Sequence, residues 1–183
     1  MDKQVQPNDI LNFWADLGDE GWWTKNPEVD QQIHDRFGGT HSDAALGKLD
    51  HWAATPDGAL ALIIVLDQFS RNMLRGDAKS FAQDEKALQI AKEALVKGLD
   101  KGCREDLRVF FYLPYEHSEC IAEQELSVQL QHSIRDSEES LKAALEHRDI
   151  IQRFGRFPHR NTVMERHTTP AEQAFLNGGG FKG

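Results

Sequence analysis

The chain has 183 residues, of which 30 are acidic and 21 are basic, so its formal net charge is -9 at neutral pH. Its length favours one domain with a self-sufficient core, and 39% hydrophobic with 28% charged residues is ordinary for a folded globular protein. An acidic chain lacks the extended basic face that wide binding of nucleic acid or anionic membrane requires. We therefore expect neither nucleic acid nor a membrane among its partners.

The N-terminal stretch M-D-K-Q-V-Q-P-N-D has no apolar signal core, and the longest apolar run, residues 59–66, is too short to span a bilayer. The two cysteines, Cys103 and Cys120, form neither a C-x-x-C pair nor a zinc spacing, so they are predicted to be reduced thiols. We expect a cytoplasmic protein with no metal and no cofactor.

Helix signals begin at the N-terminus. Pro7 and the two residues after it start a first helix, because apolar residues then recur at helical spacing, and Gly18 is its predicted end. A loop with two large aromatics, at residues 21–23, follows. Asn26 then caps a second helix that begins at Pro27.

The most apolar helix of the chain starts at Thr55 and Pro56, reads A-L-A-L-I-I-V-L and continues into D-Q-F-S-R-N-M-L-R-G. We expect it to be the central helix. Asp67 lies on an otherwise apolar face of this helix, where an unpaired carboxylate is costly. Arg71, one turn later, is its predicted ion-pair partner, with Arg75 as the alternative.

A further helix is expected over residues 84–97, with Gly98 as its stop. The aromatic-rich segment L-R-V-F-F-Y-L-P-Y-E-H-S-E follows, and Pro114 should break or kink it, since proline lacks a backbone donor. Glutamates recur on successive turns of one helical face after this proline, namely Glu116, Glu119 and Glu123. We expect Glu116 and its neighbour His117 to be held inward.

The next helix starts at Ser137 and carries His147 in the middle of its apolar stripe. Asp149 lies elsewhere on this helix, and Arg153, four residues on, is its predicted partner. Gly155 and the nearby proline oppose continuation of the helix. The irregular loop that follows carries three side chains that can converge on a ligand, namely Arg156, His159 and Arg160.

Thr169 begins a capping box with proline at the first helical position, so a last short helix is expected to end at Leu176. The glycine-rich tail, residues 177–183, is expected to be loose. No strand-like alternation of useful length occurs in the sequence. The fold class predicted is all-α, with about eight to ten helices in a single domain over residues 1–176.

The segment 147–161, H-R-D-I-I-Q-R-F-G-R-F-P-H-R-N, reverses the sign of this acidic chain. It gathers four arginines, two histidines and one carboxylate. Guanidinium groups bind phosphate and carboxylate in a bidentate manner, so the segment indicates an anion-binding site. The alternative is an internal ion-pair network that binds nothing.

Common catalytic signatures are missing from the sequence. The H-R-D at 147–149 lacks the asparagine that follows five residues later in the protein-kinase catalytic loop, and no D-F-G or glycine-rich phosphate loop occurs. No P-loop, G-x-S-x-G or H-E-x-x-H is present. His34 with His41, and His117 with Cys120, are pairs that no third metal ligand joins at a usable spacing.

Four segments carry a family resemblance: G-W-W, L-D-Q-F-S-R-N-M-x-R-G, F-Y-L-P-Y-E-H-S-E and H-R-D-I-I-x-R-F-G-R-F-P-H-R-N. With them the chain resembles the bacterial domain-of-unknown-function 924 family over nearly its whole length. The resemblance implies a tetratricopeptide-like α-α superhelix and brings no activity, so it assigns no catalytic residue. Ser70 departs from the family pattern F-P-R-N, which should loosen the turn and leave Arg71 and Asn72 in place.

Three functions stay open at this point. The first is a binding module with an Arg/His-lined pocket for a small anionic ligand or an acidic peptide end. Its candidate ligand-binding residues are Asp67, Arg71, Asn72, His117, Arg148, Arg156, His159 and Arg160. The second is an enzyme that uses the same pocket, with His147 or His159 as acid or base and Glu116 or Asp67 orienting it. The third is a structural or protein-interaction scaffold with an internal ion-pair network.

Oligomeric state is open as well. Trp22 and Trp23 are large aromatics in a segment expected to be exposed, and such side chains suit the contact of a homodimer.

Overall fold

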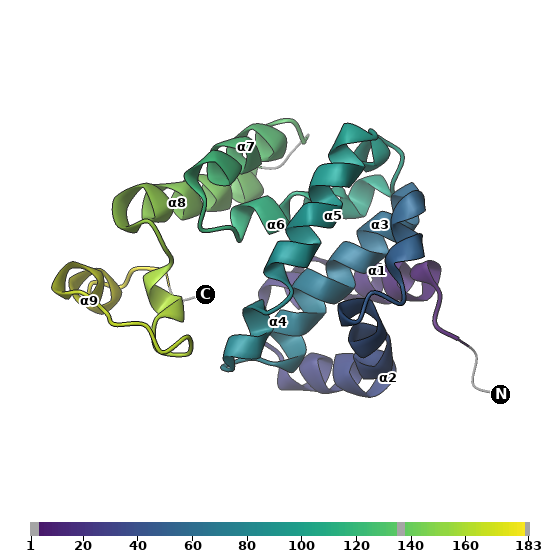
Figure 1. The fold of residues 1–183 in the computed structure, drawn as a ribbon, viewed down its shortest axis with the longest axis horizontal. Coiled ribbons are helices and arrows are strands. Elements are labelled where there is room, and N and C mark those ends of the chain that lie inside the picture. The colour runs from purple at the N-terminus through teal and green to yellow at the C-terminus, as the bar shows by residue number, and fades with distance from the viewer. Residues whose placement is uncertain (1–3, 135–137, 182–183) are drawn as a thin grey trace. The chain divides into compact units, whose positions relative to one another are not determined.

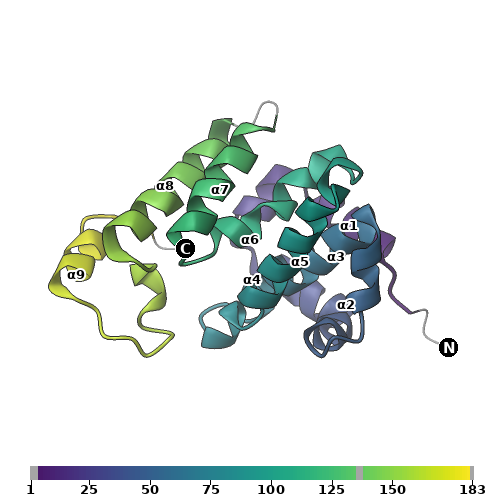
Figure 2. The same ribbon diagram turned by 45° about the horizontal axis from the view of Figure 1, so that its top comes forward.

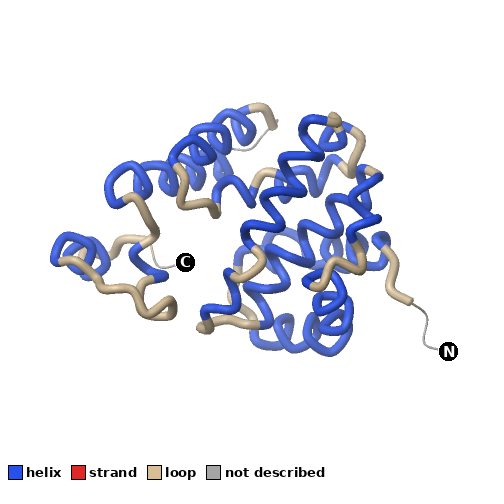
Figure 3. The backbone as a smooth tube through the Cα atoms, viewed as in Figure 1, coloured by secondary structure: helices blue, strands red, loops and turns tan. Residues whose placement is uncertain are grey.

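The computed structural model describes residues 4–134 and 138–181. Helices make up most of this part of the chain, and no strand occurs in it (Figures 1 and 3). The described residues form nine α helices, within the predicted range of eight to ten. The all-α class is therefore confirmed, whereas the tetratricopeptide-like superhelix stays a prediction.

Contacts between Cα atoms divide the chain into two compact units. Unit 1 comprises Met1–Arg75 and Lys79–Pro114, and unit 2 comprises Gly76–Ala78 and Tyr115–Gly183. The single domain over residues 1–176 stays a prediction.

Unit 1 contains five α helices. They are α1 (Pro7–Trp23), α2 (Pro27–Ala45), α3 (Pro56–Ile63), α4 (Ser70–Met73) and α5 (Asp84–Val96). Between α3 and α4 the chain forms a π-helix over Ile64–Phe69, so the central helical segment runs unbroken from α3 to α4. All residues from Ala59 to Ser70 are buried, as expected for the central helix of the core.

The predicted helix starts are confirmed by their hydrogen bonds. Asn26 Oδ1 accepts from the backbone N–H of Glu28 at 2.9 Å, and Thr55 Oγ1 accepts from that of Gly58 at 3.2 Å. A side chain does not fit at Gly58, because a Cβ there would lie 2.1 Å from the carbonyl oxygen of Trp52. The cap residue and the glycine together fix how α3 begins.

The first helix extends beyond its predicted end. Gly18 has φ 62° and ψ -175°, which is not helical, but the chain resumes the helix and α1 ends at Trp23. The predicted loop at residues 21–23 is therefore wrong. Gly18 kinks the helix instead of ending it, because glycine tolerates the non-helical conformation and the residues after it are helical again. Trp22 lies in the last turn, where its indole N–H donates to the carbonyl oxygen of Trp14 at 2.6 Å.

Ser70, where a loosened turn was expected, begins α4. Its hydroxyl donates to the carbonyl oxygen of Leu66 at 2.6 Å, and His41 Nε2 lies 2.7 Å from the same hydroxyl oxygen. Burial lowers the pKa of His41 from its ordinary value. The helical path continues through Ser70, so no loosened turn occurs there.

The core of unit 1 is rich in aromatic contacts. Phe37 packs edge-on against Phe13 with ring centroids 5.1 Å apart, and it stacks on Phe69 at 5.4 Å. Trp14 contacts Phe110 at 5.4 Å, which ties α1 to the segment that precedes Pro114. That segment, Glu105–Phe111, is a three-ten helix. The three-ten helix ends at Phe111, and α6 (Leu113–Glu116) begins with Pro114 in its first turn. The helical path is therefore interrupted just before Pro114, as predicted.

Unit 2 contains a helical hairpin, α7 (Ile121–His132) and α8 (Glu138–Phe154), and a last helix, α9 (Pro170–Asn177). Figures 1 and 2 both show α7 and α8 side by side. Ser137, the predicted start of α8, lies outside the described residues. The end of α8 is as predicted, because Gly155 has φ 70° and stops the helix.

Shorter three-ten helices connect these elements, at Asp50–Ala54, Ala78–Phe81, Leu99–Lys101 and Pro158–Arg160. The core of unit 2 includes Ile150, Ile151 and Phe157, against which three half-buried rings pack, namely Phe154, Phe175 and Phe181. Phe181 belongs to the tail that was expected to be loose, and its packing is an exception to that expectation. The tail residues 182 and 183 lie outside the described part of the chain.

Candidate functional site

The predicted site residues fall in both units. Asp67, Arg71 and Asn72 belong to unit 1, and the remaining candidates belong to unit 2. The outcome differs between them. In unit 1 Arg71 binds Asp67 and Asn72 binds Asp30, whereas in unit 2 several titratable groups gather around one aromatic ring.

Arg71 is the centre of the unit 1 group. Its Nη1 donates to Asp67 Oδ1 at 3.1 Å, as predicted, and to Asp84 Oδ1 at 2.8 Å, while Nη2 donates to Asp84 Oδ2 at 2.9 Å. Burial alone would lower the pKa of Arg71, but the charges of Asp67 and Asp84 raise it. Asp67 is fully buried, so the guanidinium serves to neutralise it.

The neighbours of Arg71 bind elsewhere. Asn72 donates to Asp30 Oδ1 at 2.7 Å, and Arg75 pairs with both carboxylate oxygens of Asp30 at 2.9 Å. Arg75 is thus not the partner of Asp67. Asp30 lies in α2, so this contact joins α2 to the end of α4.

Arg148 and Arg153 both lie on α8, but only Arg148 pairs with Asp149. Arg148 Nη2 lies 2.7 Å from Asp149 Oδ1 on the surface of α8. The predicted pairing of Asp149 with Arg153 is wrong, since the Arg153 guanidinium lies over the ring of Phe154, 4.7 Å from its centroid. Stacking on an adjacent ring competes with the exposed ion pair, which is worth little in water.

Arg156 is tied to the last helix. Its Nε and Nη2 donate to the two carboxylate oxygens of Glu172 at 2.6 and 2.9 Å, and Nη2 also donates to the carbonyl oxygen of His167 at 2.7 Å. The hydrogen bonds from Arg156 lower the pKa of Glu172 to about 2. Glu172 also accepts from the backbone N–H of Thr169 at 2.7 Å, which completes the predicted capping box.

The loop after α8 contains a second ion-pairing arginine, Arg166, whose partner Glu119 lies just before α7. This pair was not predicted from the sequence. Arg166 donates to both carboxylate oxygens of Glu119 at 2.7 and 3.0 Å. The backbone N–H of Phe157 donates to Glu119 as well, at 2.8 Å. Burial alone would raise the pKa of Glu119, but the hydrogen bonds from Arg166 and Phe157 lower it.

We call Glu119, Arg156, Arg166 and Glu172 the loop network. Its members lie on both sides of the three-ten helix Pro158–Arg160 in the sequence. Arg166 donates to the carbonyl oxygen of Phe157 at 3.1 Å and to the side-chain oxygen of Asn161 at 3.0 Å. These bonds fix the backbone immediately before and after His159 and Arg160. The predicted row of Glu116, Glu119 and Glu123 on one helical face is wrong, because α6 ends at Glu116 and α7 begins at Ile121.

The remaining candidates come together from three segments. Glu116 and His117 lie at the end of α6, His147 lies in α8, and His159 and Arg160 lie in the loop after α8. We call these five residues the histidine cluster. Its most direct contact is between Glu116 Oε1 and His147 Nδ1, which are 3.3 Å apart in a buried setting. Both residues were predicted to be held inward, and Glu116 is 4% and His147 7% exposed.

The surroundings of His147 assign its proton. Nδ1 lies 2.8 Å from the carbonyl oxygen of Ala143 and close to the Glu116 carboxylate. A carbonyl and a carboxylate are both acceptors, so the neutral imidazole carries its hydrogen on Nδ1 and keeps the lone pair on Nε2.

Arg160 is bound within the cluster, in contrast to Arg148 on the surface. Its Nη2 donates to the carbonyl oxygen of His117 at 3.0 Å, and its guanidinium lies 4.5 Å from the ring centroid of Phe157. The charge of this guanidinium also acts on Glu119. Arg160 is only 6% exposed, so its guanidinium places a cation in a largely buried part of the cluster.

Phe157 forms the aromatic wall of the cluster. Its ring centroid lies 5.5 Å from that of His147 and 5.6 Å from that of His159. Phe181 contacts the same two imidazoles from the tail, at 4.5 and 5.2 Å. His117 and His159 are half-buried, so solvent reaches the edge of the cluster through them.

The inner face of α7 is unusually polar beside this cluster. Gln124, Ser127 and Gln131 follow one helical face and are fully buried. Gln124 Nε2 donates at 2.6 Å to the carbonyl oxygens of both Glu116 and Ser118. Gln124 thereby holds the end of α6, which positions Glu116 and His117.

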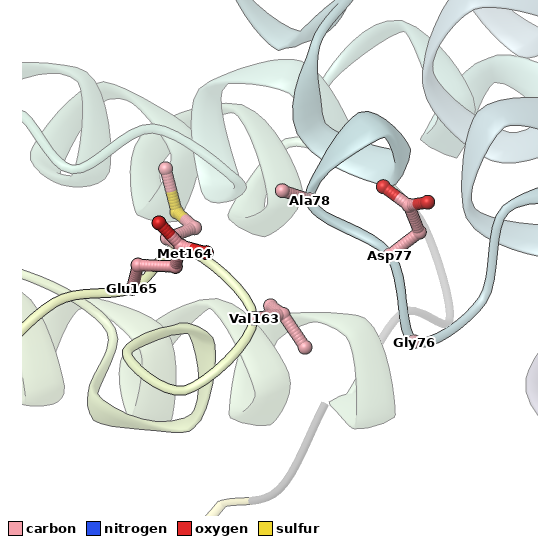
Figure 4. A pocket seen from close by; sticks show the side chains of 6 residues that line it. All are labelled: Gly76, Asp77, Ala78, Val163, Met164 and Glu165. Carbon is pink, nitrogen blue, oxygen red and sulfur yellow. The ribbon is translucent and has the colours of Figure 1, made fainter.

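An open depression of about 430 Å³ lies elsewhere in unit 2. Figure 4 shows its lining from two segments, with Asp77 and Ala78 on one and Val163 and Met164 on the other. None of the predicted site residues lines it. Glu165 at its edge has φ 53°, which is uncommon for a residue with a side chain.

Across the described ranges, 4–134 and 138–181, no three His, Cys, Asp or Glu side chains come together in a way that could hold a metal ion. None of the helices described is both long and apolar enough to cross a bilayer.

The comparison with known proteins agrees with the motifs quoted above. The sequence profile of the family described as "Bacterial protein of unknown function (DUF924)" matches residues 10–180. The chain belongs to this family. Its fold is similar to the solved structure of a protein of unknown function from Agrobacterium tumefaciens, with a TM-score of 0.90 and 44% sequence identity. That similarity covers 94% of this chain and 97% of the other, and no curated protein matches the chain.

Membership of the family confirms the resemblance carried by the four segments. Two of them, F-Y-L-P-Y-E-H-S-E and H-R-D-I-I-Q-R-F-G-R-F-P-H-R-N, supply all five residues of the histidine cluster. The family and its relative carry no activity that could be transferred to this site. The function is therefore argued from the geometry of unit 2 alone.

Proposed function

We propose that the protein is a binding module for a small anionic ligand and that the histidine cluster is its binding site. The observation that carries this proposal is that His147, His159 and Arg160 all contact the ring of Phe157, while His117 packs near His147 and its carbonyl oxygen accepts from Arg160. Arg160 is a permanent cation, and histidines gain charge as the pH falls below neutrality. Against these, the cluster contains one carboxylate, that of Glu116.

The proposal is narrower than the candidate set drawn from the sequence. Arg71, Arg148 and Arg156 each pair with a carboxylate in the described structure. An anion at any of these three would have to replace an existing ion pair. Arg160 donates to a carbonyl oxygen within the cluster and lies over the ring of Phe157 beside two histidines, so the proposal assigns the anion to this arginine.

The rigidity of the loop that carries His159 and Arg160 also supports an anion-binding site. Glu119 and Arg166 hold the backbone of Phe157, and Arg166 also holds Asn161. His159 and Arg160 lie between these two fixed points. A site whose side chains are fixed before binding loses less entropy when the ligand arrives.

The test is a titration with sulfate, whose charge is constant between pH 5 and 8. We expect sulfate to raise the melting temperature and to bind more tightly at pH 6 than at pH 8, because histidine protonation adds positive charge near Arg160. His159→Gln and Arg160→Lys should each weaken sulfate binding, by about tenfold for the loss of one charge-assisted contact. Isothermal titration calorimetry measures the affinity.

Arg148→Met is the matched control, since it removes an arginine of the same segment that lies on the surface of α8. This variant should bind sulfate as the wild type does. Equal sulfate affinity in wild type, His159→Gln and Arg160→Lys, or no binding by the wild type, would refute the proposal.

A second candidate function, an enzyme, is favoured by one contact. Glu116 orients His147 as a carboxylate orients the imidazole of a general base, and the lone pair is then on Nε2. In this case a panel of chromogenic phosphate and carboxylate esters should reveal turnover by the wild type. His147→Gln should abolish that turnover without lowering the melting temperature by more than a few degrees, and Glu116→Gln should reduce it.

A further inference from the structure

The ring of Phe181 packs against two imidazoles of the histidine cluster, as the ring of a bound ligand could. Its ring centroid lies 4.5 Å from that of His147 and 5.2 Å from that of His159, and both contacts are edge-to-face. The ring comes from the segment after α9 and not from any of the three segments that form the cluster. The cluster therefore accepts an aromatic ring between two imidazoles.

The segment that carries this ring can move at low cost. Three consecutive glycines, Gly178 to Gly180, separate α9 from Phe181, and Gly179 has φ 84°. The turn is closed by a hydrogen bond from Gly180 N–H to the carbonyl oxygen of Phe175 at 3.0 Å. Glycines permit many other backbone conformations, so release of Phe181 requires little beyond the loss of its ring contacts.

The charges of the cluster lie on the aromatic wall that Phe181 faces. Phe157 contacts the imidazoles of His147 and His159, and the Arg160 guanidinium lies over the same ring at 4.5 Å. A molecule whose aromatic ring replaced that of Phe181 would thus contact two imidazoles that share the Phe157 ring with the Arg160 guanidinium. Phe181 supplies a ring to this site but no negative charge.

We propose that the ligand of the histidine cluster is an aromatic anion, an arylalkyl carboxylate or an aryl phosphate, that displaces Phe181. Its ring takes over the edge-to-face contacts with His147 and His159, and its anionic group binds Arg160. This inference rests on the proposed function, because it names the ligand class of the same site. Phe181 acts as an internal competitor, so it lowers the apparent affinity for the ligand.

The test compares two acids of equal charge, 3-phenylpropionate and its saturated counterpart 3-cyclohexylpropionate. Calorimetry on the full-length wild type should show tighter binding of the aromatic acid, because only an aromatic ring makes the edge-to-face contacts. Phe181→Ala should bind 3-phenylpropionate about fivefold more tightly than the wild type does, since the competitor is gone. Phe181→Leu keeps an apolar side chain without a ring and should give a smaller gain.

Phe154→Ala is the control, because it removes a ring that packs on Phe175 in the same apolar group. It should leave the affinity for 3-phenylpropionate unchanged. Equal affinities of wild type and Phe181→Ala for the two acids would overturn the inference, and cluster-dependent sulfate binding would then still support the proposed function. Failure of sulfate and of both acids to bind any variant would overturn both.

Discussion

At the scale of single residues, ion pairs differ in how deeply their carboxylates are buried. Arg71 lies between Asp67, which is fully buried, and Asp84. Arg75 pairs with Asp30 in similar bidentate geometry, but its side chain is 38% exposed. The two arginines are four residues apart and differ mainly in the burial of their partners.

We predict that Arg71→Met lowers the free energy of unfolding by about 3 kcal/mol, because it leaves the Asp67 carboxylate buried without its cation. Arg75→Met should cost about 1 kcal/mol or less, since its pair is accessible to water. Urea unfolding followed by circular dichroism measures both values. Similar losses for the two variants would show that burial of Asp67 does not set the energy of this pair.

Glu172 links stability to pH. Its pKa is lowered to about 2 in the folded chain by the hydrogen bonds from Arg156, against an ordinary value of 4.5. A carboxyl group with a lowered pKa stabilises the fold above its unfolded pKa, and this contribution is lost as the pH falls through the folded value. The relevant window is therefore between about pH 4.5 and pH 2.

We predict that Glu172→Gln unfolds more readily than the wild type at pH 7 and that this difference shrinks as the pH falls through the window. Glu146→Gln, an exposed glutamate of α8, is the matched control and should follow the wild type at every pH. Urea midpoints measured between pH 7 and pH 2 test this. A difference between wild type and Glu172→Gln that stays constant with pH would contradict the assignment.

The partners of charged residues could be predicted from the sequence only where they are local. Arg71 follows Asp67 by one helical turn, so helical spacing alone identifies the pair. Glu172 lies 16 residues from Arg156, and the partner of Arg166 lies 47 residues before it. Such pairs depend on how α9 and the loop fold back, which the spacing of residues in the chain does not specify.

At the scale of elements, the kink in α1 and the interior of α2 give a direct comparison between two glycines. Gly18 has φ 62° and ψ -175°, a combination that residues with a side chain rarely adopt. Gly39 lies within α2, with open space around a Cβ at this position. The same substitution should therefore have opposite effects at the two sites.

Gly18→Ala is predicted to lower the free energy of unfolding by about 1 to 3 kcal/mol, because alanine is strained in that conformation. Gly39→Ala should raise it by about 0.5 to 1 kcal/mol, since alanine is the better residue inside a helix. Thermal and urea unfolding of the two variants decide the matter. A stabilised Gly18→Ala chain would mean that the α1 kink is not required by the fold.

Helix starts were easier to predict than helix ends. Asn26, Thr55 and Thr169 each begin a helix as expected, because a cap side chain and a following proline act on the first turn alone. The end of α1 was placed too early, at Gly18. A glycine can terminate a helix or kink it, and the choice depends on packing such as the contact of Trp22 with Trp14.

At the scale of the whole molecule, the sequence predicted the all-α class and the five residues that form the histidine cluster. It did not separate them from Arg71, Arg148 and Arg156, whose charges are paired within the chain. For Arg156 that separation requires the tertiary position of Glu172, which lies 16 residues away, whereas Arg148 pairs with the adjacent Asp149. In the segment 147–161, Arg148 and Arg156 thus form ion pairs within the chain, and Arg160 belongs to the candidate anion site.

The central claim is that the histidine cluster binds a small anion. The most direct measurement is the NMR spectrum of the imidazole nitrogens and carbons during a titration with sulfate at pH 6. We predict saturable shifts at His117, His147 and His159, with the exposed His34 unchanged as the internal reference. Shifts of equal size at His34 and at the three cluster histidines, or none at all, would contradict the account.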